Sequence, residues 1–370
     1  MRRAALIMAL ACLLARAAGA PNFSLPGPCS ASPWKPQFTV PDDLRTGGLP
    51  RTLSLLVTTP SCPADASLPF GSPAPVLFFF NGFMNKASWY QRIVQQIASW
   101  GWVVVQYDTP SLPPVTIAAE VQLFPALAEW VAAQANDTAS PLYGVADPQR
   151  LATSGHSRGG KLASLVFTTY PELVSATYLV DPVDLSRFSP ESADNPSAAR
   201  ALRESGQAIG MAAAGITGSC NPVDGSSAFM WAAAGNGSWR GLEPGAAHAT
   251  FADGGCVVNA GADLLCGRGK DSRAQAAALT STQALAWFWQ QLVGEQQTVP
   301  PSESPMPAFA RWVAAQQVAG TLEFEVKGEE GAALWTAEAA RAAKEGGLEA
   351  PPALPTAAEE EAACAVAGGR

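Results

Sequence analysis

Alternating and continuous apolar runs along the chain indicate β-strands. Leu53, Leu55 and Val57 alternate with smaller or polar residues, as in a strand that is half buried. The runs VLFFF at 76–80 and WVVVQYD at 102–108 are almost continuous, which is typical of strands covered on both faces. Shorter apolar segments predict further strands at 151–153, 176–180 and 208–217.

Segments with helical spacing separate these strands. Apolar residues recur every four positions from Trp89 to Ile97, and Gly101 follows as a typical helix stop. The segment 117–136 is also predicted to be helical, although Pro125 is expected to bend or split it. Two more helices are predicted at 159–170 and 272–293.

This order of strands and helices predicts the fold class. Strands that alternate with helices form right-handed βαβ units and a mostly parallel sheet with helices on both faces. We therefore expect one α/β domain over residues 50–294. Residues 21–49, rich in Pro, Ser and Gly, are expected to form an N-terminal arm. Residues 295–370 form a Pro/Ala/Glu-rich tail that is expected to be largely disordered.

The first twenty residues have the pattern of a targeting segment. Arg2 and Arg3 precede an apolar stretch at 4–15, and Ala18-Gly19-Ala20 offers a small-residue cleavage site. We expect residues 1–20 to be a signal or targeting peptide; the alternative is a short buried N-terminal helix. The rest of the chain has no apolar run of about 18 residues, so we expect membrane contact to be at most peripheral.

Composition and charge narrow the classes of function. Apolar residues make up 48% and charged residues 15% of the 370 residues, which favours a globular, core-rich protein. The formal net charge of −8 disfavours a nucleic-acid-binding protein, which would need basic patches. Of the seven cysteines, all but Cys12 follow the targeting segment and permit disulfides, whose pairing the sequence leaves open. Because the chain has only two histidines and no CxxC pair, we expect no structural zinc site. No other metal and no cofactor is expected either.

The segment SGHSRGGK at 154–161 contains the strongest candidate for chemistry. Residues 155–159 match the pattern G-x-S-x-G, between a predicted strand and a predicted helix. In such a nucleophile elbow Ser157 occupies a strained turn, and the backbone N–H of Arg158 faces a developing oxyanion. The alternative interpretation is a glycine-rich turn with an exposed serine. The strand–turn–helix context favours the elbow and predicts the α/β-hydrolase fold, with its mostly parallel central sheet.

A nucleophilic serine requires a base and an acid. Of the two histidines, His156 adjoins Ser157 in the elbow, so His248 is the candidate base. The acid should lie between Ser157 and His248 in the chain. Asp181 directly follows the strand predicted at 176–180 and is the preferred candidate, whereas the competing aspartates are Asp184 and Asp224.

A second oxyanion donor is expected after the strand at 76–80. Asn81-Gly82 ends that strand, and the backbone N–H of Phe83 would then face the site. In isolation the same residues fit a plain Asn-Gly turn equally well.

Four segments together resemble those of one family: GHSRGGK at 155–161, YLVDPVD at 178–184, AAHATFADG at 246–254 and PVLFFFNGFMNKASWY at 75–90. They are similar to the elbow, aspartate, histidine and oxyanion segments of chlorophyllases of the green-algal and plant type. The resemblance covers about residues 50–294 and not the tail. Two features depart from it: the family usually has His-Gly where this chain has Asn81-Gly82, and the segment just after His248 follows the family pattern less closely than expected.

The resemblance implies an activity and its location. A chlorophyllase hydrolyses the phytyl ester of chlorophyll or a pheophytin-type pigment to the chlorophyllide-type acid and phytol. Ser157 would form the acyl-enzyme, His248 would act as base, and Asp181 would orient His248. The resemblance also implies a chloroplast location, although the N-terminal segment itself looks secretory or lumenal. Two rival hypotheses are a general carboxylesterase or lipase-like hydrolase and a catalytically silent pigment- or terpenoid-binding relative.

An apolar substrate also implies apolar walls around the site. Candidate wall residues, beside Phe83, are Met84, Trp89, Phe188, Phe229, Met230 and Trp231.

Overall fold

The chain was analysed as a computed structural model. The structure describes residues 20–111, 113–186, 189–223, 225–294, 303–329, 332, 335 and 354–368. The targeting segment predicted for residues 1–20 therefore lies almost entirely outside the described residues.

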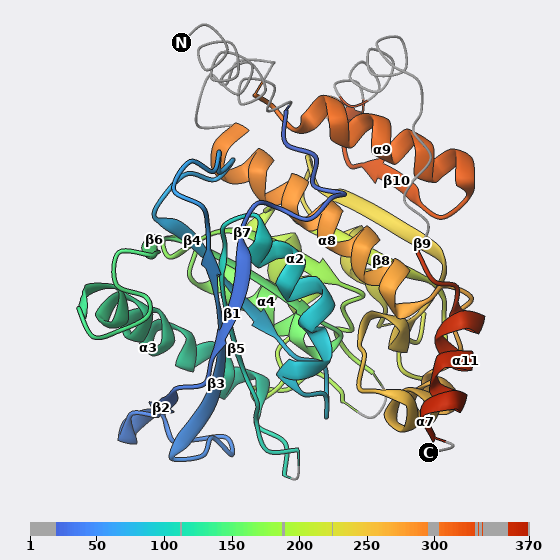
Figure 1. The fold of residues 1–370 in the computed structure, drawn as a ribbon. Helices are drawn as coiled ribbons and strands as arrows, with labels where there is room; N and C mark the ends of the chain where they lie inside the picture. The colour runs from blue at the N-terminus through green and yellow to red at the C-terminus, as the bar shows by residue number, and fades with distance from the viewer. Residues whose placement is uncertain are drawn as a thin grey trace, which may run out of the picture.

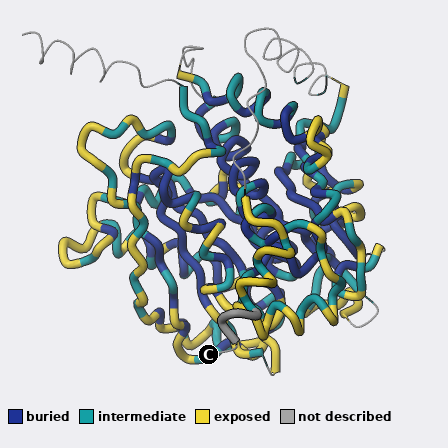
Figure 2. Tube along the Cα trace, turned by 45° about the vertical axis from the view of Figure 1, so that its right-hand side comes forward, coloured by how far each residue is buried: buried dark blue, intermediate teal, exposed yellow. Residues whose placement is uncertain are grey.

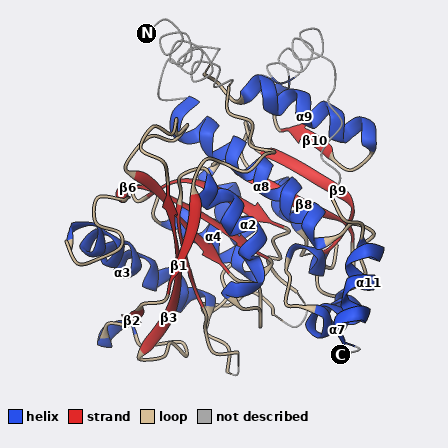
Figure 3. Cartoon of the chain, viewed as in Figure 1, coloured by secondary structure: helices blue, strands red, loops and turns tan. Residues whose placement is uncertain are grey.

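A single mixed sheet forms the centre of the molecule (Figure 1, Figure 3). Its strand order is β1-β3-β5-β4-β6-β7-β8-β9-β10, and β2 pairs with β3. The strands from β5 to β9 in this order are parallel, whereas β1, β2, β3 and β10 pair antiparallel with their neighbours. The strand bounds are β1 Ser30–Trp34, β2 Gln37–Thr39, β3 Thr52–Ser61, β4 Ala74–Phe80, β5 Val103–Tyr107, β6 Ala146–His156, β7 Val174–Val180, β8 Gly210–Ile216, β9 Trp239–Ala247 and β10 Glu323–Val326.

Helices cover both faces of this sheet (Figure 1). One face packs against α3, α4, α5 and α6, and the other packs against α2, α8 and α9. The helix bounds are α2 Gln91–Ser99, α3 Ile117–Asn136, α4 Arg158–Thr169, α5 Ala198–Ser205, α6 Ser227–Ala233, α7 Cys256–Cys266, α8 Arg273–Trp289, α9 Met306–Ala319 and α11 Ala357–Gly368. Short 3-10 segments lie at Asp42–Leu44, Ala87–Tyr90 and His248–Phe251, and a π-helical segment at Gln290–Gly294 follows α8.

Strand β4 shows why the continuous apolar runs become central strands. Successive side chains of a strand point to opposite faces of the sheet. Accordingly Val76 and Phe78 pack in the core on the α3–α4 side, whereas Leu77 and Phe79 pack in the core on the α2–α8 side. All seven residues of β4 are buried, and the sheet appears dark blue in Figure 2. The mostly parallel α/β architecture expected from the sequence is confirmed.

Both ends of the chain pack on this domain. In the expected N-terminal arm, Phe23 is buried against Trp100 and Phe70, and β1 and β2 extend the sheet. The expectation of a largely disordered tail is wrong for its described residues. Helix α9 and strand β10 belong to the fold because Phe309 and Phe324 pack on Trp239 at the edge of the sheet.

Three disulfides link the six cysteines beyond the targeting segment. They join Cys29 to Cys62, Cys220 to Cys266, and Cys256 to Cys364. The last bond ties α11, in the tail, to α7. Among the helices that the structure describes, none combines the length and apolarity needed to cross a bilayer.

Candidate active site

Ser157 sits in a strained turn between β6 and α4. Its backbone has φ 58° and ψ −121°, in the left-handed half of conformational space that residues with a side chain rarely adopt. The turn is tight enough to require glycine on both sides. A Cβ on Gly155 would lie 2.4 Å from the carbonyl oxygen of Gly159, and a Cβ on Gly159 would lie 2.1 Å from that of Phe80. This is the geometry of a nucleophile elbow.

His248 lies between Ser157 and Asp181. Its Nε2 is 2.8 Å from Ser157 Oγ, and its Nδ1 is 2.6 Å from Asp181 Oδ2. The three side chains come from the β6–α4 turn, the end of β7 and the segment after β9. All three are buried. An Nδ1–H that donates to the carboxylate leaves Nε2 free to accept the proton of the serine hydroxyl.

Asp181 is held as a carboxylate by several donors. Besides His248, the backbone N–H of Ala214 donates to Oδ1 at 3.0 Å and the amide of Asn221 donates to Oδ2 at 3.1 Å. Burial by itself raises the pKa of Asp181, but the hydrogen bond and charge of His248, together with the backbone N–H of Ala214, outweigh it and lower the pKa below its usual value. Asp181 is therefore suited to stabilise an imidazolium at His248.

Of the two competing aspartates, the structure describes only Asp184. Asp184 caps α5: its carboxylate accepts the backbone N–H groups of Ala198 and Ala199 and the hydroxyl of Ser197. It also pairs with the buried Lys161 at 3.4 Å. Asp224 lies outside the described residues.

His156 forms two side-chain hydrogen bonds that the sequence did not predict. The hydroxyl of Tyr90 accepts the N–H of Gly82 at 3.0 Å and the amide of Asn85 at 2.7 Å, so its own proton goes to His156 Nδ1 at 3.0 Å. His156 Nε2–H then donates to the backbone carbonyl of His248 at 3.0 Å. Burial, and then the neighbouring His248, lower the pKa of His156 to about 3, so this imidazole is neutral.

The two residues expected to supply oxyanion donors line the same cavity as Ser157. Arg158 begins α4, and the first N–H groups of a helix have no intrahelical acceptor. Phe83 lines the cavity in front of Ser157. The residue that departs from the family pattern, Asn81, fixes the strand end by donating to the carbonyl of Tyr107 at 2.8 Å and to Asp108 at 3.0 Å.

The side chain of Arg158 acts away from the nucleophile. It forms an ion pair with Glu120 of α3 and donates to the carbonyl of Val115 at 2.6 Å. Arg158 thereby fixes the segment before α3, whose residues Val115 and Thr116 form part of the cavity wall.

A cavity of about 600 Å³ opens in front of Ser157 and His248, which together with Asp181 form the candidate triad. Trp89 and Phe83 line it, as expected, whereas Met84 lines a smaller hollow beside it. Apolar wall residues that the sequence did not reveal are Val183, Leu185, Ala249, Ala252, Val258 and Ala262. Among the described residues, no group of three or more His, Cys, Asp and Glu side chains is arranged to hold a metal ion.

The expectation that α6 contributes to the wall is wrong. Met230 is fully buried in the core on the α3–α4 side of the sheet, and Trp231 packs beneath Arg240 and Lys327. Phe229 of the same helix is partly exposed and is not among the residues that line the cavity. Phe188 lies outside the described residues.

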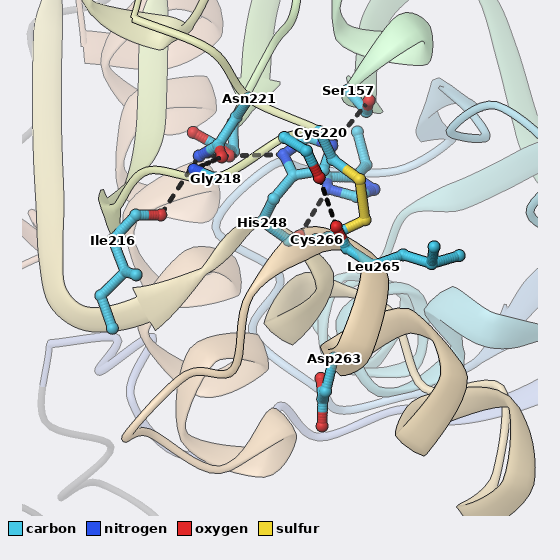
Figure 4. The surroundings of a disulfide bond; sticks show 12 residues. Ser157, Ile216, Gly218, Cys220, Asn221, His248, Asp263, Leu265 and Cys266 are labelled. Carbon is cyan, nitrogen blue, oxygen red and sulfur yellow. Dashed lines mark hydrogen bonds and ion pairs between the residues drawn. A yellow bond between two sulfur atoms is a disulfide. The ribbon is translucent and has the colours of Figure 1, made fainter.

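A disulfide adjoins the triad (Figure 4). Cys220 and Cys266 both line the cavity, and Cys220 precedes Asn221, which donates to Asp181. Asn221 also accepts the N–H of Gly218 at 2.8 Å and donates to the carbonyl of Ile216. The disulfide therefore connects the loop that orients Asp181 to helix α7.

The mixed, mostly parallel sheet and the serine elbow define an α/β-hydrolase fold. Residues 49–197 match the family model described as Chlorophyllase, which confirms the resemblance to that family over this part of the chain. The matched residues include Ser157 and Asp181, and His248 follows them in the sequence. This match favours an ester hydrolase. The search of curated proteins found no match to this chain.

Proposed function

We propose that this protein hydrolyses the phytyl ester of chlorophyll, or of a pheophytin-type pigment, through an acyl-enzyme on Ser157. The observation that carries the proposal is the hydrogen-bonded series Ser157, His248 and Asp181 at a largely apolar cavity, in a chain with a chlorophyllase-family segment. A chloroplast location follows from the same proposal, because this substrate belongs to plastids.

Acylation begins with proton transfer. His248 Nε2 takes the hydroxyl proton as Ser157 Oγ attacks the carbonyl carbon of the propionate ester. The carbonyl oxygen becomes an oxyanion, which the backbone N–H groups of Arg158 and Phe83 stabilise. The imidazolium gives its proton to the phytol oxygen as the C–O bond breaks. Phytol leaves, and the pigment remains bound as an ester of Ser157.

Deacylation repeats the same proton transfers with water. His248 takes a proton from a water molecule, whose oxygen attacks the acyl carbon, and the second tetrahedral intermediate is held by the same N–H groups. His248 returns the proton to Ser157 Oγ, and the chlorophyllide-type acid leaves. Asp181 keeps Nδ1 protonated throughout, so that Nε2 faces Ser157 in both half-reactions.

The test compares two esters on the full chain. Chlorophyll a and a short-chain p-nitrophenyl ester are each incubated with the protein and with Ser157→Ala, and chlorophyllide and phytol are measured by chromatography. We expect both products from the unmutated protein, and a fall in rate of about a thousandfold or more in the variant. Ser189→Ala is the matched control, because Ser189 lines the same cavity and its hydroxyl accepts the amide of Asn195.

Each alternative outcome has a definite meaning. Cleavage of the short ester without chlorophyllide formation would replace the proposed substrate with that of a general carboxylesterase. No cleavage of either ester by a folded protein, judged by its circular dichroism, would contradict the proposal and favour a pigment-binding role.

A further inference from the structure

Helix α7 presents apolar residues on two opposite faces. One face, formed by Val258, Ala262 and Cys266 at intervals of four residues, lines the cavity. The opposite face carries Val257 and Leu264, seven residues apart and therefore in line along the helix, and their exposed fractions are 88% and 87%. None of the residues of α7 is buried, so the helix contributes nothing to the hydrophobic core. It separates the cavity from the outside.

Covalent and polar contacts hold α7 in this position. Disulfides fix both of its ends, to Cys364 of α11 and to Cys220 beside the triad. Its single charged residue, Asp263, pairs with Arg273 at 2.6 Å and is mostly covered. The outward face of α7, formed by Val257, Leu264 and Leu265, is thus apolar and carries no charge of its own.

Further exposed apolar residues belong to the segment after β4, which also reaches the cavity. Phe83 lines the cavity and is 51% exposed, and the adjacent Met84 is 55% exposed. Val258 of α7 also lines the cavity while remaining partly exposed. Contiguous apolar patches are uncommon on the surface of a soluble protein unless they meet a partner. Phe83 and Val258 reach both the cavity and the solvent, and so lie at the rim of the candidate active site.

We propose that the outward face of α7, together with Phe83 and Met84, docks on an uncharged lipid surface and so places the cavity entrance against it. The inference rests on the proposed function for its purpose, since a phytyl ester is delivered from an apolar phase. A lipid surface is favoured over a protein partner because a partner seated around the entrance would close it, whereas a lipid phase supplies the substrate there.

The charge of the protein favours an uncharged lipid surface over an anionic one. The chain has a formal net charge of −8, and α7 adds no free cation that could attract anionic headgroups. Binding should therefore depend on the burial of apolar area, as for other interfacial helices, and only weakly on salt.

The test uses vesicles of phosphatidylcholine and the full chain carrying Ser157→Ala, so that no lipid is turned over. Binding is measured by flotation for this chain, for the same chain with Val257→Asp and Leu264→Asp, and for a matched control with Val318→Asp. Val318 is 79% exposed on α9, on a different part of the surface from α7 (Figure 1). We expect the α7 variant to bind at least about tenfold more weakly and the control to bind unchanged.

Hydrogen exchange then locates the contact. We expect vesicles to slow exchange in peptides covering 256–266 and 82–85, and not in peptides covering α9. Equal binding of the α7 variant and the control would overturn the proposal. So would binding that requires anionic vesicles, or light scattering that shows α7-dependent self-association without lipid.

These failures are distinguishable from failure of the proposed function. The α7 variant, with Ser157 restored, should cleave a soluble short ester at the unmutated rate, because neither Val257 nor Leu264 lines the cavity. Loss of vesicle binding with full cleavage of the soluble ester supports the docking surface. Loss of cleavage by the unmutated chain would count against the proposed function alone.

Discussion

Different neighbours fix the serine and the histidine of this site. The backbone of Ser157 is held by the tight passage of Gly155 and Gly159 past neighbouring carbonyl groups. The backbone of His248 is held by His156, which is itself held by the hydroxyl of Tyr90. The same hydroxyl accepts the N–H of Gly82, beside the expected oxyanion donor. One buried phenol thus connects the segment of the expected oxyanion donor to His248, the candidate base.

Removal of that phenol should slow catalysis more than it weakens binding. In Tyr90→Phe the N–H of Gly82 and Nδ1 of His156 lose a shared hydrogen-bond partner. The segments of Gly82 and His156 are then no longer held in fixed positions relative to one another. We expect kcat for a short ester to fall about ten- to a hundredfold, with little change in KM. Steady-state kinetics, normalised to the fraction of protein that a fluorophosphonate labels, measures both constants.

Tyr178→Phe is the matched control for this change. Tyr178 is equally buried, but its hydroxyl finds no hydrogen-bond partner in the described part of the chain. Its loss should leave kcat unchanged. A similar fall in both variants would show that the effect of Tyr90 is one of general packing.

At this scale the sequence predicted part of the site. Ser157 and His248 followed from one motif and from the scarcity of histidine, and Asp181 from its place after a strand. The roles of Asn221 and Tyr90 could not be predicted, because each is brought to the site by a loop or a helix whose position depends on tertiary packing.

Among the elements, the loop after β8 and helix α7 depend on one another. The disulfide between Cys220 and Cys266 spans 46 residues and joins them beside Asp181. Neither element has apolar anchors of its own in the core comparable to those of β4 or α8. The covalent link therefore has both a stabilising and a positioning effect.

Replacement of this disulfide should reduce both stability and activity. In Cys220→Ser with Cys266→Ser the unfolded chain gains freedom, so we expect the free energy of unfolding to fall by about 2–4 kcal/mol. Because Asn221 loses its neighbouring anchor, we also expect a lower kcat for the fraction that remains folded. Denaturant unfolding and ester kinetics measure the two effects.

The bond between Cys29 and Cys62 offers the matched comparison. It spans 33 residues and links the N-terminal segment to the end of β3, away from the triad. Cys29→Ser with Cys62→Ser should lower stability to a similar degree and leave kcat unchanged. If kcat fell equally in both double variants, the positioning effect assigned to Cys220–Cys266 would be wrong.

Patterning predicted some elements better than others. The central strands β4 and β5 are continuous apolar runs and were predicted from them. Strand β9 was missed because its sequence, WRGLEPGAA, contains two glycines and a proline, and only its pairing with β8 and β10 makes it a strand. Pro125 does not split α3, which runs unbroken through it.

At the scale of the whole molecule, the sheet includes residues beyond the domain boundary at 294 that the sequence predicted. The tail was expected to be largely disordered because of its Pro, Ala and Glu content, yet β10 extends the sheet at its β9 edge and α9 packs there. The aromatic residues of α9 and β10 become one cluster only when Phe309 and Phe324 meet Trp239, which lies far from them in the sequence. Composition alone could not reveal such a contact.

The whole fold converges on one chemical claim, that Ser157 is a nucleophile activated by His248. The most direct measurement is the mass of peptides from the full chain after treatment with a fluorophosphonate, which bonds covalently to an activated serine. We expect a single label on the peptide that contains Ser157, and labelling about a thousandfold slower or more in His248→Ala. A label on another residue, or no label on a folded chain, would contradict it.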